Sequence, residues 1–102
     1  MLNIKNDFLS VDIAIIGAEV RKVTSADGSV DYMWNGNTQV WAGVSPVLFP
    51  IVGKLKDDTL RFAGKEYNLT KHGYARYSEF KILAQSQSSV TLFIEDQKHP
   101  MI

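Results

Sequence analysis

The chain has 102 residues, 45% of them hydrophobic, and its eleven basic residues balance eleven acidic ones. This length suits one small domain, and the charge balance predicts no nucleic-acid partner and no membrane partner. The absence of cysteine excludes disulfides and thiolate metal sites, while residues 1–7 lack the apolar core of a signal peptide, so we expect a cytoplasmic protein.

Residues 10–15 form the first expected element, because apolar and polar side chains alternate along them. Such period-two alternation is typical of a half-buried β-strand. Turn signals follow at Asp27-Gly28, between Val23 and Val30, and at Asn35-Gly36, after the apolar residues 32–34. This opening part of the chain therefore predicts short strands joined by tight turns.

The same opening segment leads into Gly17, as the first strand of a dinucleotide-binding fold leads into its glycine turn. That motif needs two further glycines, so that backbone can approach a pyrophosphate closely. Here Glu19 and Lys22 occupy those two positions, and no helical periodicity follows. The sequence therefore argues against dinucleotide binding, and we expect no cofactor.

Residues 35–56 differ from the rest, since they hold Trp41 and the two prolines Pro46 and Pro50 in an apolar setting. Two prolines four positions apart cannot both lie in a central strand. A long apolar loop of this kind is uncommon unless it shapes a site. For Trp34 and Trp41 themselves, packing in the core is the simpler interpretation.

Residues 60–69 are expected to form a hairpin, with Gly64-Lys65 as the two central turn residues. Residues 90–94 again alternate, and no segment shows the apolar spacing of an amphipathic helix. About eight short strands at regular spacing predict an all-β fold, an antiparallel β-sandwich. Asp57-Asp58, by contrast, are expected to form a solvated turn rather than an acid–base pair.

The strongest candidate for chemistry is residues 71–76, in which His72, Tyr74 and Arg76 lie within five positions. An imidazole and a guanidinium can hydrogen-bond hydroxyl groups, and an aromatic ring can stack on the C–H face of a sugar. The alternative is an ordinary loop, held by local salt bridges, in which the hydrogen-bonding groups of His72 are satisfied within the protein. His99, the other histidine, is expected to be exposed and to have no functional role. No metal site is expected.

Four segments, in order and at consistent spacing, carry a resemblance to one family. They are residues 17–20 (GAEV), 45–56 (SPVLFPIVGKLK, preceded by Trp41), 64–69 (GKEYNL) and 71–76 (KHGYAR). Together they resemble the bacterial branch of the aldose 1-epimerase, or galactose mutarotase-like, family. The resemblance implies that residues 1–102 are the N-terminal portion of a large antiparallel β-sandwich.

In that family a glutamate base and a histidine acid open the sugar ring so that the anomers interconvert. The resemblance implies that this catalytic pair lies beyond Ile102. It also implies substrate-binding roles for His72, Arg76 and Lys54, toward an aldohexose or a sugar phosphate. Lys54 stands where the family usually has arginine. Lysine keeps the positive charge of arginine but lacks its bidentate hydrogen-bonding geometry.

Two further expectations follow for the chain by itself. It is expected to be inactive as an isomerase, and a partial sandwich can associate with itself through open sheet edges. The alternative function is a non-catalytic β module that binds carbohydrate or a protein partner through the same loop.

Overall fold

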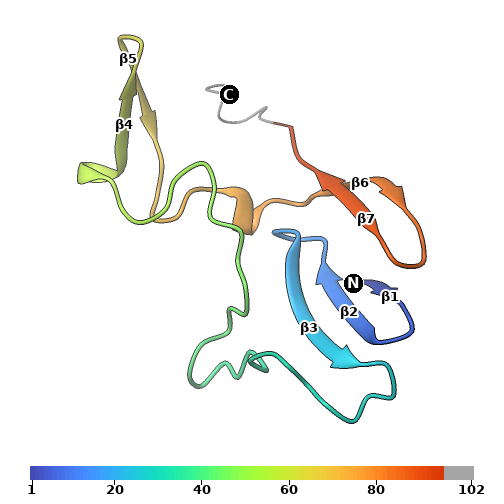
Figure 1. Cartoon of the computed structure of the whole chain (residues 1–102). Coiled ribbons are helices and arrows are strands. Elements are labelled where there is room, and N and C mark those ends of the chain that lie inside the picture. The colour runs from blue at the N-terminus through green and yellow to red at the C-terminus, as the bar shows by residue number, and fades with distance from the viewer. Residues whose placement is uncertain (96–102) are drawn as a thin grey trace.

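The computed structural model describes residues 1–95 and is built from short strands, with no α-helix in that range (Figure 1). The strands are β1 (Leu2–Lys5), β2 (Leu9–Ala14), β3 (Glu19–Ser25), β4 (Thr59–Phe62), β5 (Lys65–Asn68), β6 (Lys81–Gln85) and β7 (Val90–Phe93), and two single 3-10 turns are η1 (Lys56–Asp58) and η2 (Ala75–Tyr77). All pairings between these strands are antiparallel, which confirms the predicted all-β class. No helix within residues 1–95 has the length and apolar character to cross a membrane.

The first three strands form a sheet in the order β1-β2-β3. The alternation predicted for residues 10–15 places Ile13 in the core, with 7% of its surface exposed. A bulge interrupts the ladder, since Asp12 pairs with Lys22 while Ile13 pairs with Val20. Such a bulge bends the strand and increases its twist.

The predicted hairpin at residues 60–69 is confirmed as β4–β5, but its turn lies one residue earlier than expected. Phe62 pairs with Lys65, so Ala63 and Gly64 are the central residues. Both have positive φ angles, 52° and 76°, which is the pattern of a type I′ turn. The expectation of Gly64-Lys65 as the central turn residues was wrong because Ala63 adopts the left-handed conformation.

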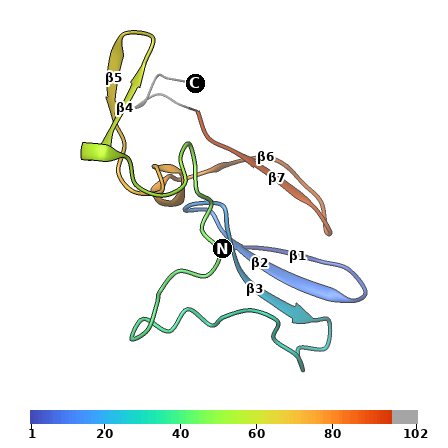
Figure 2. The ribbon, with the colours of Figure 1, turned by 60° about the vertical axis from the view of Figure 1, so that its left-hand side comes forward.

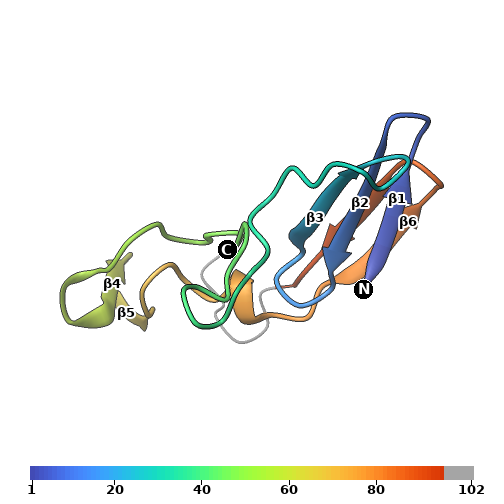
Figure 3. The same ribbon diagram turned by 90° about the horizontal axis from the view of Figure 1, so that it is seen from below.

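The β6–β7 hairpin runs beside the three-stranded sheet and forms a second layer (Figures 2 and 3). Backbone hydrogen bonds tie it to the sheet at both ends. The Lys5 amide donates to the Gln87 carbonyl at one end, and the Gly17 amide donates to the Ser78 carbonyl at the other. Two antiparallel layers are the arrangement that a β-sandwich requires.

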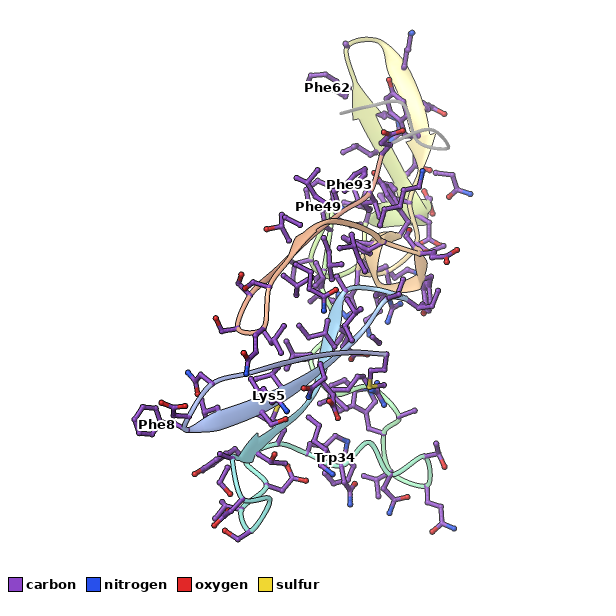
Figure 4. The ribbon with its side chains drawn as sticks, turned by 90° about the vertical axis from the view of Figure 1, so that its right-hand side faces the viewer. Lys5, Phe8, Trp34, Phe49, Phe62 and Phe93 are labelled. Atoms are coloured by element: carbon purple, nitrogen blue, oxygen red, sulfur yellow. The ribbon has the colours of Figure 1, made fainter. Side chains whose placement is uncertain are left out.

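The whole is elongated and thin, with extents of 54 × 34 × 15 Å and a radius of gyration of 16.3 Å. A compact chain of this length would have a radius of about 13 Å. The buried hydrophobic residues within residues 1–95 are only Ile13, Leu69 and Ala75. Phe8 and Phe62 lie toward opposite ends of the molecule, both exposed (Figure 4). Individual contacts, rather than a large core, therefore position the loops.

Candidate functional site

The Phe49 carbonyl group is one of the points at which the apolar loop between β3 and β4 is fastened to the segment after β5. The Phe49 carbonyl accepts hydrogen bonds from the amides of Tyr74 and Ala75, at 3.0 and 3.1 Å. Gly73 lies directly against the same carbonyl, so that a Cβ at this position would overlap the Phe49 oxygen. The Phe49–Pro50 peptide bond is cis. Two segments far apart in sequence thus meet backbone to backbone.

His72 is locked to Gly53 by two hydrogen bonds. The His72 amide donates to the Gly53 carbonyl (2.8 Å), and the Gly53 amide donates to His72 Nδ1 (2.9 Å). His72 has a φ of 66°, a left-handed conformation that histidine tolerates better than most residues. Because Nδ1 accepts a hydrogen bond, the proton of the neutral ring lies on Nε2. His72 therefore offers an N–H donor on the side of the ring away from Gly53.

Arg76 is held by its neighbours along the chain. Its Nη2 donates to the Lys71 carbonyl (3.0 Å), and its guanidinium carbon lies 4.5 Å from the centre of the Tyr77 ring. Its Nε is buried and has no hydrogen-bond partner within residues 1–95. The Gly17 turn packs against its backbone, because a Cβ at Gly17 would lie 2.7 Å from the Arg76 carbonyl oxygen.

Glu19, at the start of β3, fixes the other end of the apolar loop. Its Oε2 accepts hydrogen bonds from the Val44 and Ser45 amides, both at 2.9 Å, while its Oε1 pairs with Arg21 at 2.8 Å. Burial raises the pKa of Glu19, but these donors together outweigh burial and lower it on balance. The carboxylate is therefore the stable form that holds the loop to the sheet.

These contacts leave a hollow of about 420 Å³ between the apolar loop and the segment after β5. It is lined by Trp41, Pro46, Leu48, Lys71, His72 and Arg76. This volume lies in the range of small-molecule sites. The first three residues form an apolar wall and the last three supply hydrogen-bond donors. A ligand with one apolar face and an edge of oxygen atoms would match both walls.

The structure brings two of the three predicted substrate-binding residues together. His72 and Arg76 both line the hollow, whereas Lys54 does not. The Lys54 ammonium lies 3.7 Å from an oxygen of Asp58, in the exposed 3-10 turn η1. His99 lies outside the described residues. The binding roles of His72, Arg76 and Lys54 stay predictions.

The aromatic residues are arranged differently from the expectation. Trp34 and Trp41 are 40% and 53% exposed, so the interpretation of both as core residues was wrong. Tyr74, the expected stacking residue, instead meets Phe49 edge-on at 6.5 Å. The apolar wall was therefore missed by the sequence analysis, although the unusual loop at residues 35–56 was the signal that could have led to it.

Comparison with known proteins identifies the family of this chain. The profile of the aldose 1-epimerase family matches residues 1–101. Among solved structures, a galactose mutarotase related enzyme from Lactobacillus acidophilus is 38% identical, with a TM-score of 0.88 over 95% of this chain and 32% of its own. A galactose mutarotase-like protein from Lactobacillus casei is 34% identical, with a TM-score of 0.84 over 90% of this chain and 31% of its own.

A curated relative, the plasmid-encoded protein LacX from Lactococcus lactis subsp. lactis, is 29% identical over 99 residues, which are 92% of this chain and 33% of the relative. The chain thus spans about a third of the length of the proteins it matches. The fold agrees with the galactose mutarotase-like neighbours, and the expected family resemblance is confirmed over nearly every residue. The chain belongs to the aldose 1-epimerase family.

Proposed function

We propose that this chain supplies part of the sugar site of an aldose 1-epimerase-type isomerase. The observation that carries the proposal is the hollow, whose lining has an apolar part and a polar part, the polar part including His72, with its Nε2–H donor, and Arg76. A pyranose has the same two-sided character, with C–H groups on its faces and hydroxyls at its edge. His72 and Arg76 would donate to hydroxyl or phosphate oxygens.

Anomer interconversion needs a base that takes the proton of the C1 hydroxyl and an acid that protonates the ring oxygen. The ring then opens, C1 rotates and the ring closes again. The hollow offers donors but no carboxylate, because Glu19 is engaged by the Val44 and Ser45 amides and does not line it. Residues 1–95 therefore contribute binding, and the base must come from elsewhere in a complete enzyme.

The test is a titration of the isotope-labelled chain with D-galactose and D-glucose, followed by amide and imidazole NMR signals. His72→Asn is the decisive variant. Asparagine tolerates the left-handed conformation, and its Oδ1 can accept the Gly53 hydrogen bond in place of Nδ1. It lacks the Nε2–H donor, however. We expect His72→Asn to keep the fold and to weaken sugar binding about tenfold, in line with the loss of one buried hydrogen bond.

His72→Ala serves as the matched comparison, because it removes both the donor and the lock on Gly53. Exchange between the two sugar anomers is followed in the same samples by saturation transfer. We expect the wild-type chain to bind sugar without accelerating this exchange. Sugar binding that survives His72→Asn unchanged, or no sugar binding at all, would count against the proposal. Rapid anomer exchange would show that the chain already holds an acid and a base.

A further inference from the structure

Trp41 is the aromatic residue of the hollow, and its ring is placed by three contacts within its own loop. The Trp41 amide donates to the Asn37 carbonyl (2.8 Å), and the Trp34 indole Nε1 donates to the Trp41 carbonyl (2.9 Å). The Trp41 ring lies over Gly43, where a Cβ would be 2.7 Å from Cζ2 and 2.8 Å from Cε2. The backbone of Gly43 thus covers part of the ring, and only glycine leaves room for it.

The remainder of the ring is accessible, since 53% of Trp41 is exposed and the residue lines the hollow. Pro46 and Leu48 continue the apolar wall beside it. His72 and Arg76 line the same hollow. A planar ring that is supported on one side, in a hollow that also holds hydrogen-bond donors, is a platform for a flat, half-apolar ligand.

We propose that Trp41 is a sugar-stacking and specificity-determining residue of this site, a conclusion that rests on the proposed sugar-binding function. Its indole ring packs on the C–H face of a pyranose while His72 and Arg76 hold the hydroxyl edge. D-galactose offers such a face, because its C3, C4 and C5 hydrogens lie on the same side of the ring. A ligand without an unbroken C–H face loses the stacking contact and keeps only the polar contacts.

Gly43 acts as a positioning residue in this arrangement. Gly43→Ala would displace the indole ring of Trp41 while removing none of the lining side chains. The variant should therefore weaken sugar binding without removing any group that touches the ligand. A smaller loss than in Trp41→Ala is expected, because a displaced ring still covers part of the hollow.

The experiment uses saturation-transfer NMR on the chain with D-galactose, and the dissociation constant is measured for three variants. Trp41→Ala removes the ring, Trp41→Phe retains an aromatic face, and Tyr32→Ala is the matched control. Tyr32 is 60% exposed on the same loop and does not line the hollow. We expect Trp41→Ala to weaken binding about tenfold, Trp41→Phe less than threefold, and Tyr32→Ala not at all.

In the wild-type complex, saturation of aromatic protons should reach the C3, C4 and C5 hydrogens of galactose most strongly. The Trp41 indole N–H signal should move during the titration. If Trp41→Ala does not fold, these two wild-type signals and Trp41→Phe still decide the question. Binding that is lost in His72→Asn but unchanged in Trp41→Ala overturns this proposal alone. An absence of sugar binding in every sample overturns it together with the proposed function.

Discussion

The three-stranded sheet and the site region are held together in different ways. In the sheet, a repeated ladder of backbone hydrogen bonds joins β2 to both of its neighbours. The site region, residues 41–56 with 71–78, has no ladder and depends on contacts that each occur once, such as the Phe49 carbonyl and the His72–Gly53 lock. A single substitution should therefore lower the free energy of unfolding only slightly in the sheet and strongly in the site region.

The largest expected effect is that of Gly73→Ala. The new Cβ would overlap the Phe49 carbonyl oxygen, and the φ of 74° is strained for any residue with a Cβ. We expect a loss of about 3 kcal/mol in the free energy of unfolding, measured by urea denaturation, since backbone strain and steric overlap add together. Sugar binding should be lost as well, because His72 is the preceding residue.

Gly28→Ala is the control for this variant. Gly28 has a nearly equal φ of 77°, yet nothing lies within 4 Å of the position that its Cβ would take. It lies three residues after the end of β3, in the turn that leaves the sheet. We expect a loss of about 1 kcal/mol, the cost of the backbone conformation alone. Equal losses in both glycine variants would mean that the contact with Phe49 contributes nothing.

Glu19→Ala should have the next largest effect. It removes the acceptor of two loop amides and the partner of Arg21, in a side chain that is only 13% exposed. Hydrogen bonds to a charged group suggest a loss of about 2 kcal/mol in the free energy of unfolding. Amide exchange at Val44 and Ser45 should accelerate more than exchange within the sheet. Uniform acceleration would indicate that Glu19 supports the sheet rather than the loop.

The same contrast explains what the sequence could predict. Alternation between apolar and polar residues indicated the strands, because a ladder imposes a period on the sequence. The contacts of the site region impose no such period on the sequence. Nothing in the spacing of Glu19, Val44 and Ser45 shows that a carboxylate joins them across 25 residues. The wall formed by Trp41 was missed for the same reason, whereas His72 and Arg76 were found because they are close in sequence.

Stability should fall at acidic pH as the carboxylates of Glu19 and Asp27 become protonated. The pKa of Glu19 is below its ordinary 4.5, so its stabilising effect is complete above that pH and is lost as the pH falls through the lowered value. Hydrogen bonds from Ser29 and Ser25 lower the pKa of Asp27 from 3.8 to about 2, and its effect is lost between those values. Urea midpoints measured from pH 6 to pH 2 give the profile.

Two variants assign the loss of stability to its two carboxylates. Glu19→Gln should remove the contribution that begins to be lost near pH 4.5, which belongs to the site region. Asp27→Asn should remove the contribution that is lost between pH 3.8 and about 2, which belongs to the turn after β3. Both carboxylates must be ionised in the folded state, so each variant flattens the profile on its acidic side. A profile that is unchanged by Glu19→Gln would contradict the lowered pKa and the anchoring role together.

Lys54→Ala is expected to have the smallest effect, although Lys54 is adjacent to Gly53. Lys54 and Asp58 are 64% and 37% exposed and lie 3.7 Å apart, so the pair should contribute less than about 0.5 kcal/mol to stability. The family resemblance places a sugar contact at Lys54, whereas the hollow does not include it. We expect the galactose dissociation constant to change less than about twofold, against tenfold for His72→Asn. A loss in Lys54→Ala as large as that in His72→Asn would mean that the ammonium leaves Asp58 to bind the sugar, and that the site extends past Gly53 toward β4.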